Sequence, residues 1–395
     1  MALRTLILTL PPFEGGVPAK TRILAQELAQ RGHQVTIAFY APVSSHRHLS
    51  PSPWGFYRPG VEAGRCFDDE FRAFAVGCRG GELEFPYYLS SSRWRALIAS
   101  HDRHIAVGGT VLISNPLRVA GVPHFVWCAS DMLGDRLDRR AAMSWPRRLV
   151  DQTLIGPVQA ALERRILGGN GRVVTVGRHA QNMFRQLGFA LDAAATMPIP
   201  TDPDIFTPPV LAAEPGIIGF AGRANDPRKN LGLLVKAVVI AHANDPRIRL
   251  RLTGQPEPAT AALIRQLGAE DLVEWRGTLS RHDLPQFYAE LDLFALPSAQ
   301  EGFGIVGIEA MACGVPVIST RCGGPEDYVI PEENGLLTNQ IASEMADALL
   351  KVTADRDLRR RFSAKARATA MDFYSPARFR AALDENWRQV WGETP

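Results

Sequence analysis

The chain of 395 residues is long enough for two or three domains, because one hydrophobic core rarely serves more than about 250 residues. Hydrophobic residues make up 46% of the sequence and charged residues 22%, which excludes a disordered chain, a collagen-like repeat and a disulfide scaffold. The net charge of +3 hides an asymmetry, since residues 1–200 carry 23 Lys and Arg against 15 Asp and Glu, a net charge of +8. No block combines enough basic and aromatic residues to indicate a nucleic-acid partner.

The N-terminal stretch MALRTLILTLPP predicts a first buried strand, because it lacks the basic region and the small-residue cleavage site of a signal peptide. Other apolar runs also have the length of core strands, far short of a membrane-spanning helix. The five cysteines include no Cys-x-x-Cys pair, which favours reduced, mostly buried thiols over a disulfide or zinc framework. These features predict a cytoplasmic protein.

In the first half of the chain, short apolar runs alternate with amphipathic stretches. LRTLILTL leads through a loop rich in Pro and Gly into a helix that ends at Gly32, and a strand follows at QVTIAFY. Further strands are expected at residues 104–114, 124–130 and 172–177, and a helix at 179–188. Residues 44–95 show little periodicity and predict long loops.

A Pro-dense stretch, PIPTDPDIFTPP at 198–209, cannot be helical and suits a linker between domains. After it the alternation of strands and helices starts again, which indicates a second parallel sheet with helical crossovers. The segments expected to form this second domain are GIIGFAG, NLGLLVKAVVIAHAN, IRLRLTG, a helix to Leu267, VEWRG, LPQFYAELD, LDLFALPS, IVGIEAMACG and VPVISTR.

Residues 296–329 form the strongest functional block. A strand ends at a Pro-Ser turn, Glu301 follows in the loop, and Gly302, Phe303 and Gly304 open a helix. That helix carries Glu309, with seven residues between the two glutamates. Free N–H groups at a helix N-terminus attract anionic or polyhydroxyl ligands, and two carboxylates could accept hydrogen bonds from ligand hydroxyls. The alternative is one solvated glutamate on a loop and another on a helix surface.

The second block, IGFAGRANDPRKNLGLLVKAV, places Arg223 and Lys229 around a turn between a strand and a helix. Two cations at the carboxyl edge of a sheet are suited to a diphosphate, although they could also be ordinary surface cations. The third element is the pair Gly15-Gly16 after the first strand, which by itself is weak evidence because many turns need glycine.

EGFGIVGIEAMACGVPVISTRCGG, FAGRANDPRKN and FEGGVPAKTRILAQELAQRGHQV together resemble the family 4 glycosyltransferases, which are retaining enzymes of the GT-B fold. The resemblance implies an α/β protein with two Rossmann-like, doubly wound domains that face each other across a cleft. Residues 1–200 would form the acceptor-binding domain and residues 201–375 the nucleotide-sugar domain. Residues 376–395 have helical spacing and would pack back on the first domain.

The resemblance also implies roles for individual residues. Arg223 and Lys229 would bind the diphosphate of the donor and stabilise the leaving group. Glu301 would lie close to the transferred sugar, and Glu309 would hold the ribose hydroxyls. The remaining donor-binding positions would be the backbone of Phe303, Gly304 and Ile305, and Gly16 from the other domain.

No cofactor or metal is expected, because Arg and Lys can neutralise the diphosphate; the nucleotide-sugar is a substrate. The triplet Asp202-Pro203-Asp204 looks like a metal motif of other transferases but lies in the linker, and we interpret it as a turn. One position departs from the family pattern: Ala129, Ser130 and Asp131 stand where a His near the reacting sugar is usual. His124 lies at the start of the strand and is interpreted as a structural or surface residue.

The sequence therefore predicts a metal-independent, retaining transferase that uses a UDP- or GDP-sugar. The alternatives are a nucleotide-sugar binder without turnover and a GT-B epimerase. The acceptor is an open question between a sugar, a lipid and a small molecule. Residues 136–165 carry seven Arg against three acidic residues, interspersed with apolar residues that include Trp145, which suggests peripheral binding to an anionic membrane on its inner face. The alternative is two ordinary amphipathic helices whose Arg residues are solvated or paired to Asp138, Asp151 and Glu163.

Overall fold

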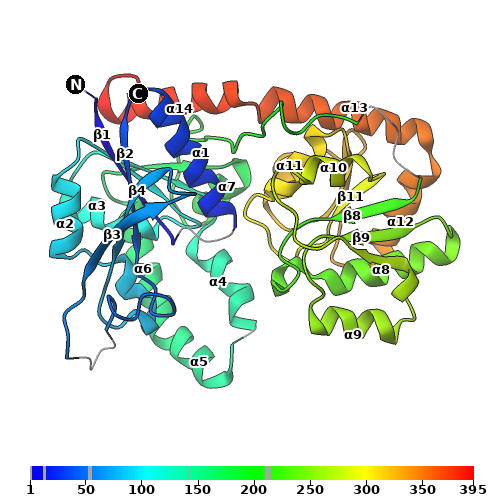
Figure 1. Cartoon of the computed structure of the whole chain (residues 1–395), viewed down its shortest axis with the longest axis horizontal. Coiled ribbons are helices and arrows are strands. Elements are labelled where there is room, and N and C mark those ends of the chain that lie inside the picture. Colours follow the sequence, from blue (N-terminus) through cyan, green and yellow to red (C-terminus); the bar gives the residue numbers. More distant parts are fainter. Residues whose placement is uncertain (1, 12–14, 52–55, 142, 210–214) are drawn as a thin grey trace. The chain divides into compact units, whose positions relative to one another are not determined.

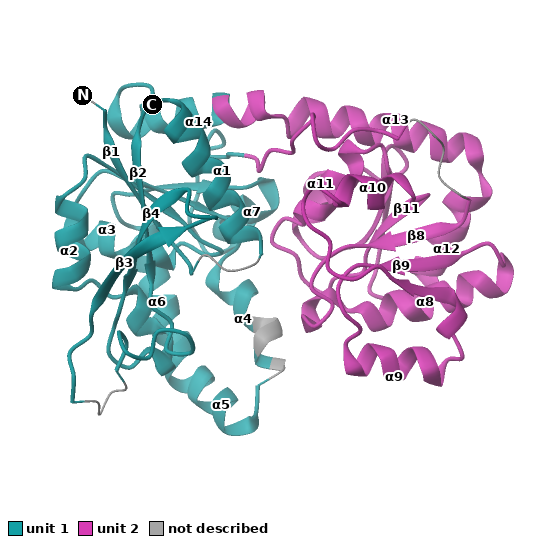
Figure 2. Cartoon of the chain, in the orientation of Figure 1, with its two compact units in different colours: residues 1–197, 381–395 teal, residues 198–380 magenta. Residues whose placement is uncertain are grey.

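The computed structural model describes residues 2–11, 15–51, 56–141, 143–209 and 215–395. The chain divides into two compact units, coloured separately in Figure 2. Unit 1 comprises residues 1–197 and 381–395, and unit 2 comprises residues 198–380. Each unit is a parallel sheet with helices on it, so the predicted α/β class with two Rossmann-like domains is confirmed (Figure 1).

The strands of unit 1 are rich in Val, Ile, Leu and Phe, as parallel strands covered on both faces require. In chain order they are β1 (Arg4–Thr9), β2 (Gln34–Tyr40), β3 (Val61–Cys66), β4 (Phe71–Val76), β5 (Arg103–Val107), β6 (Phe125–Cys128) and β7 (Arg172–Thr175). They form one sheet in the order β3-β4-β2-β1-β5-β6-β7, parallel except for β3. At its centre, Ile7 lies opposite Ile37 and Ile105 on the two neighbouring strands.

Helices connect β1 to β2 and each strand from β4 to β7 to the next, as crossovers between parallel strands require. They are α1 (Gly16–Gln30), α2 (Ser92–Ala99), α3 (Asn115–Ala120), α4 (Met132–Ala141), α5 (Trp145–Val150), α6 (Gly156–Leu167) and α7 (Arg178–Gln186). A π-helical turn, Asp151–Ile155, joins α5 to α6 without leaving the helical region of backbone angles, so residues 145–167 run as one continuous helix.

The last helix, α14 (Pro376–Trp391), ends in unit 1, and its packing there confirms the prediction for the C-terminal segment. Trp387 is fully buried, with its ring 5.1 Å from that of His33 and 4.3 Å from that of Trp391. An ion pair between Arg31 and Asp384 adds a polar link to α1.

The sheet of unit 2 has the strand order β10-β9-β8-β11-β12-β13, which is the 3-2-1-4-5-6 order of a doubly wound domain. All the pairings are parallel. The strands are β8 (Ile217–Phe220), β9 (Arg249–Leu252), β10 (Val273–Trp275), β11 (Leu293–Leu296), β12 (Val317–Thr320) and β13 (Gly335–Thr338).

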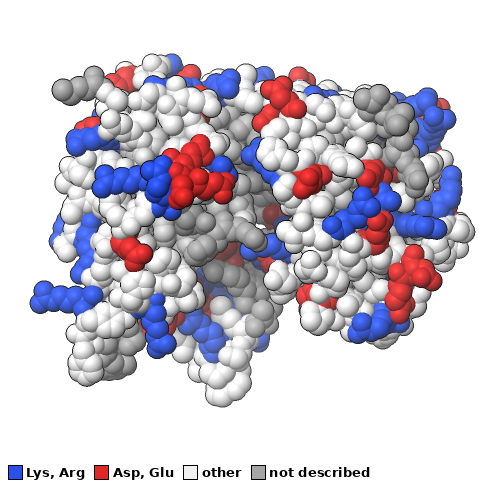
Figure 3. All heavy atoms as spheres, in the orientation of Figure 1, with Lys and Arg blue, Asp and Glu red and all other residues white. Residues whose placement is uncertain are grey.

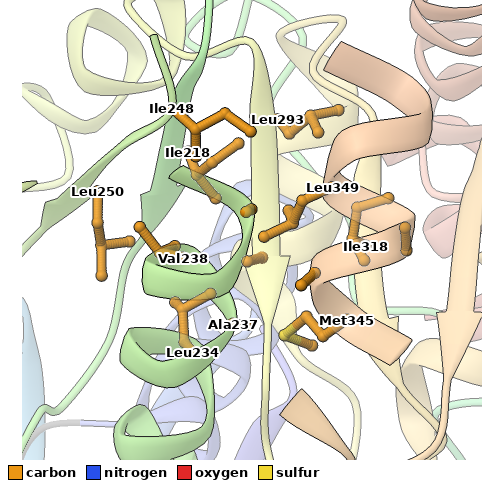
Figure 4. Close-up of a cluster of buried hydrophobic side chains, with 14 of the residues drawn as sticks. Ile218, Leu234, Ala237, Val238, Ile248, Leu250, Leu293, Ile318, Met345 and Leu349 are labelled. Carbon is orange, nitrogen blue, oxygen red and sulfur yellow. The ribbon is translucent and has the colours of Figure 1, made fainter. Parts of the chain in front are cut away.

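The helices of unit 2 are α8 (Leu231–Asn244), α9 (Pro258–Gln266), α10 (Leu284–Ala289), α11 (Ile305–Ala312), α12 (Ala342–Ala354) and α13 (Arg356–Phe373). Figure 4 shows the core between the sheet and two of these helices, α8 and α12. Its labelled side chains are Ile218, Leu234, Ala237, Val238, Ile248, Leu250, Leu293, Ile318, Met345 and Leu349. This buried apolar layer holds the carboxyl ends of the strands in fixed positions relative to one another.

Two expectations about unit 1 were wrong. Residues 44–95 are not only loops, because they contain β3, β4 and the first turn of α2. The segment FRAFAV of β4 alternates in burial, but two of its inward residues are alanines, which weakens the hydrophobic signal. The strand expected over 104–114 ends at Val107, because the chain turns at Gly108 and a 3₁₀ turn follows at Leu112–Ser114.

The division between the units lies at 197/198, where the sequence placed it at 200/201, and the second boundary lies inside α14 at 380/381. Hydrogen bonds explain the first position. Trp127 Nε1 donates to the carbonyl of Met197 in unit 1, whereas the N–H of Thr201 donates to the carbonyl of Tyr374 in unit 2. In the part of the chain that the structure describes, no helix is both long and apolar enough to cross a bilayer.

Candidate functional site

The predicted site residues of unit 2 follow β8 and β11, the two neighbouring strands at which the strand order reverses. In a doubly wound sheet the crevice at this switch point, at the carboxyl ends of the strands, is where ligands bind. Arg223 and Lys229 come after β8, and Glu301 comes after β11. All three residues therefore follow strands that end at one edge of the sheet, and the structure brings Lys229 and Glu301, which the sequence had placed in two separate blocks, into contact.

Lys229 and Glu301 form an ion pair between Nζ and Oε2. Both side chains are mostly buried, and the Ser298 hydroxyl donates to the same carboxylate oxygen over 3.3 Å. A partly desolvated cation and carboxylate in contact interact more strongly than an exposed pair, because water screens them less. Ser298 was not singled out in the sequence, although it stands in the Pro-Ser turn that ends β11.

Arg223 lies closer to solvent and pairs with Asp226, with Nη2 3.0 Å from Oδ2. The Asp226 carboxylate also accepts two hydrogen bonds from the Arg228 side chain and one from the backbone N–H of Arg228. These hydrogen bonds close the turn Pro227–Lys229. Burial acts to raise the pKa of Asp226, but the hydrogen bond and charge of Arg228, with the charge of Arg223, outweigh it and lower the pKa. The turn thus gathers two arginines, Arg223 and Arg228, around one ionised carboxylate.

The N-terminus of α11 carries the glycines of the motif. Gly304 is the residue before the helix, with φ of +78°, and no side chain caps it. A Cβ built there would lie 2.7 Å from the Tyr328 hydroxyl, which donates to the Gly304 carbonyl over 2.9 Å. The Phe303 side chain is buried against Tyr328, with ring centroids 5.8 Å apart, so only its backbone can face a ligand. Ile305 begins the helix, so the first-turn N–H groups of α11 form an uncapped positive dipole end.

The loop after β12 fixes the backbone of Glu301. The N–H of Glu301 donates to the carbonyl of Cys322 and the N–H of Gly324 donates to the carbonyl of Glu301, both over 2.7 Å. In the sequence the Arg-Cys-Gly-Gly stretch stands out only as part of a longer motif, and the structure gives it this positioning contact.

Glu309 lies in the middle of α11 and is 9% exposed. The Tyr288 hydroxyl of α10 donates to Glu309 Oε2 over 3.3 Å. Burial raises the pKa of Glu309 to about 7, against the opposing effects of the Arg281 charge and the Tyr288 hydrogen bond. Neither Tyr288 nor Arg281 was predicted as a site residue. Tyr288 lies in α10, just before β11, and its apolar neighbours in the sequence suggest an ordinary core residue.

Gly16 is the first residue of α1, and Gly15 before it has φ of +124°. Residues 12–14 of the predicted Gly-rich loop lie outside the described residues. A buried cation that the sequence did not reveal follows on the same helix: Lys20 Nζ donates to the carbonyls of Gly108, over 2.8 Å, and Trp127, over 3.0 Å. Burial lowers the pKa of Lys20 to about 7. This lysine ties α1 to the carboxyl ends of β5 and β6.

Asp131, where the family pattern has a different residue, caps α4. Its Oδ1 accepts the N–H of Gly134 over 2.8 Å, and Glu163 accepts the N–H of Met132 over the same distance. Burial raises the pKa of Asp131, and it raises that of Glu163 to about 7. His124 is buried and contacts the carbonyl of Val122 through Nδ1 over 2.8 Å, in agreement with its structural interpretation.

Asp202 and Asp204 lie in a turn, in which the N–H of Asp204 donates to Asp202 Oδ1 over 3.0 Å. No group of three or more His, Cys, Asp or Glu residues suited to a metal occurs among the described residues. All five cysteines are free, and four of them are buried. A cavity of about 780 Å³ lies at the opposite, amino edge of the second sheet, near Ile217, Arg249 and Val273. None of the predicted site residues lines it, so we assign the site to the carboxyl edge on topology and charge.

The two parallel-sheet units, with the last helix returning to the first, have the GT-B fold of glycosyltransferases. Residues 202–369, which make up most of unit 2, match the family model described as glycosyl transferases group 1.

Sucrose-phosphate synthase from Thermosynechococcus elongatus superimposes with a TM-score of 0.76 at 20% identity, over 98% of this chain and 99% of that chain. HepE from Anabaena, in complex with UDP and glucose, superimposes with a TM-score of 0.72 at 19% identity, over 98% of this chain and 100% of that chain. At these identities the likeness shows the fold alone.

Among curated proteins, the chain is 31% identical over 232 residues to a D-inositol 3-phosphate glycosyltransferase of Xylanimonas cellulosilytica, covering 53% of this chain and 55% of that protein. The chain thus spans about half the length of such relatives. It is 27% identical over 391 residues to a GDP-mannose-dependent alpha-(1-6)-phosphatidylinositol monomannoside mannosyltransferase of Mycobacterium tuberculosis, covering 90% of each.

Proposed function

We propose that the protein is a retaining, metal-independent glycosyltransferase that moves a sugar from a UDP- or GDP-sugar to an acceptor hydroxyl. The observation that carries this proposal is the Lys229–Glu301 pair at the switch point of the second sheet, beside the uncapped N-terminus of α11. Cations and helix N–H groups suit a diphosphate, and a neighbouring carboxylate suits a sugar. The family match and the names of the relatives support the same class.

In this reaction Arg223 and Lys229 bind the diphosphate of the donor. The bond between the anomeric carbon and the β-phosphate oxygen breaks with its electron pair on the phosphate, so preorganised cations lower the barrier at that point. Lys229 then exchanges part of its interaction with Glu301 for the phosphate oxygens. No metal is needed if the two side chains supply this charge.

Glu301 accepts hydrogen bonds from hydroxyls of the transferred sugar and stabilises positive charge at its anomeric carbon. The acceptor oxygen attacks from the face that the leaving group vacates, which retains the configuration, and the acceptor proton passes to the departing phosphate oxygen. The backbone N–H groups at Phe303, Gly304 and Ile305 bind sugar hydroxyls or the distal phosphate. Glu309 holds the ribose, and Gly16 of unit 1 contributes to the diphosphate.

Unit 1 binds the acceptor in this proposal. The reaction then belongs to the synthesis of a bacterial-type glycolipid, polysaccharide or glycoconjugate. The enzyme would work in the cytoplasm, on the inner face of the membrane. The Mycobacterium tuberculosis relative is named a phosphatidylinositol monomannoside mannosyltransferase, and this name supports a lipid acceptor.

Two measurements test the proposal. A thermal-shift screen with UDP, GDP, ADP and their sugars identifies the donor base, because a ligand that binds the folded state raises its stability by RT ln(1 + [L]/Kd). Incubation with the selected nucleotide-sugar should then release nucleotide by slow hydrolysis, and NMR of the released sugar should show the donor's anomeric configuration first. Binding without any hydrolysis or transfer would indicate a non-catalytic binder, and an epimerised nucleotide-sugar would indicate an epimerase.

A further inference from the structure

Helix α5 exposes large apolar side chains to solvent. Trp145 is 77% exposed, Leu149 53%, Val150 38% and Leu154, in the π-helical turn that follows, 42%. These four residues, here called the α5 patch, are among fifteen exposed large hydrophobic side chains in the described residues, yet they fall within ten positions. No residue of α5 is buried. Such a concentration marks an interaction surface, since single exposed apolar residues are otherwise scattered.

The inner side of the same segment is charged. Arg136 is 1% exposed and pairs with Asp151, which is fully buried. Arg140 Nε lies 2.5 Å from Asp151 Oδ2, and Arg147 Nη2 lies 2.5 Å from Glu84 Oε1. Asp151, in the π-helical turn, is thus buried in ion pairs with two arginines of α4, whereas the side chains of the α5 patch are exposed. Three of the seven Arg residues that the sequence assigned to a membrane, Arg136, Arg140 and Arg147, form ion pairs within unit 1 instead, which corrects that part of the expectation.

The residues that remain outside define the chemistry of the partner. Arg148 is exposed next to Leu149, and Arg164 and Arg165 are exposed further along the same continuous helix. Neither Arg164 nor Arg165 pairs with a carboxylate among the described residues. In Figure 3 the tip of unit 1 that carries α5 is predominantly white, with basic side chains nearby. A Trp-containing apolar tip with adjacent arginines complements the interface of an anionic bilayer.

We propose that the α5 patch docks the protein on an anionic lipid surface, with Trp145 and Leu149 at the level of the headgroups. The biological role of this docking rests on the proposed function, because docking through unit 1 would bring a lipid-linked acceptor to the unit assigned to acceptor binding. The docking itself is a property of the surface and is measurable without any transfer reaction.

The test is flotation with vesicles of phosphatidylcholine alone and of phosphatidylcholine and phosphatidylglycerol in equal parts, at low and high salt. The wild type should float with the anionic vesicles, and high salt should weaken the binding severalfold without abolishing it, because apolar insertion is not screened. The double variant Trp145→Ala/Leu149→Ala should show at least a tenfold lower partition coefficient. Phe373→Ala is the matched control, because Phe373 is 57% exposed in unit 2 and should not affect binding.

A wild type that stays unbound with anionic vesicles at low salt overturns the proposal, and so does a double variant that floats as well as the wild type. Sedimentation velocity tests whether a second copy of the chain binds the α5 patch instead. If the wild type does not bind vesicles but forms a concentration-dependent dimer that the double variant loses, the patch is a dimer interface and the proposal is wrong. Thermal unfolding verifies that the variants fold. Donor hydrolysis without vesicles, measured in parallel, separates failure of the proposed function from failure of docking.

Discussion

Lys229 and Glu301, 72 positions apart in the chain, form an ion pair at the point where the strand order of the second sheet reverses. The pair joins the turn after β8 to the loop after β11, and Ser298 orients the same carboxylate. It explains why two sequence blocks with separate patterns belong to one site: each follows one of two adjacent parallel strands, whose carboxyl ends meet at the same edge.

Removal of the cations should impair transfer with little effect on folding. Lys229→Ala and Arg223→Ala should each cost about 2–4 kcal/mol in the transition state, which is roughly a 30- to 1000-fold loss of kcat/KM. Lys236→Ala is the matched control, since Lys236 is exposed on α8 of the same unit. Steady-state kinetics and thermal unfolding of all three variants check this, and near-wild-type kcat/KM in both site variants would refute the assignment.

Glu309→Gln should act mainly on nucleotide binding, with a larger increase in the KM for the donor than decrease in kcat. The pKa of Glu309 is about 7, so its carboxylate form gives way to the neutral form as the pH falls from 8 to 6. A carboxylate accepts stronger hydrogen bonds from ribose hydroxyls than a neutral group does. The KM of the wild type should therefore rise over this fall in pH, and that of the variant should change much less. A wild-type KM that is constant from pH 6 to 8 would contradict the ribose assignment.

The same carboxyl makes folding stability depend on pH. Because burial raises the pKa of Glu309 from 4.5 in the unfolded chain to about 7, the folded state binds the additional proton between these values. The contribution to the free energy of unfolding is complete below pH 4.5 and is lost as the pH rises to 7, by on the order of 3 kcal/mol. Chemical denaturation of wild type and Glu309→Gln at pH 5 and pH 7.5 measures this. The free energy of unfolding of the wild type should fall relative to that of the variant between pH 5 and pH 7.5. If the difference between the two proteins is the same at both pH values, the pKa of Glu309 is not raised by burial.

Gly304→Ala should destabilise unit 2 and reduce activity, because the left-handed backbone costs about 1–2 kcal/mol for a residue with a Cβ and the new atom meets the Tyr328 hydroxyl. Gly268→Ala is the control, since Gly268 also has a positive φ, of +62°, but a Cβ there meets nothing within 4 Å. Denaturant unfolding should show a larger loss for Gly304→Ala than for Gly268→Ala. Equal losses would mean that the approach to Tyr328 is accommodated.

Transfer should survive removal of divalent cations. Arg223 and Lys229 supply positive charge at the proposed diphosphate site, so EDTA should leave the rate within about twofold of the untreated enzyme. Activity abolished by EDTA and restored by Mg²⁺ or Mn²⁺ would overturn metal independence.

The sequence by itself determined the α/β class, the linker near residue 200, most strands and helices of unit 2, and the packing of the last helix. Each of these follows from a local signal: an apolar run of strand length, a helical period, a Pro-dense stretch or a glycine at a helix end. It missed β3 and β4, because an exposed edge strand such as β3 lacks a hydrophobic alternation, and β4 has small inward residues.

Only the tertiary structure decided how charged residues are used. Asp131 caps a helix, Lys20 is buried on two carbonyls, and Glu309 is enclosed beside Tyr288. Arg136 points inward to Asp151 while Trp145 points outward, the reverse of what composition suggests. The pKa and the partner of a charge depend on burial and on residues distant in the chain, and these are set only when helices and strands pack together.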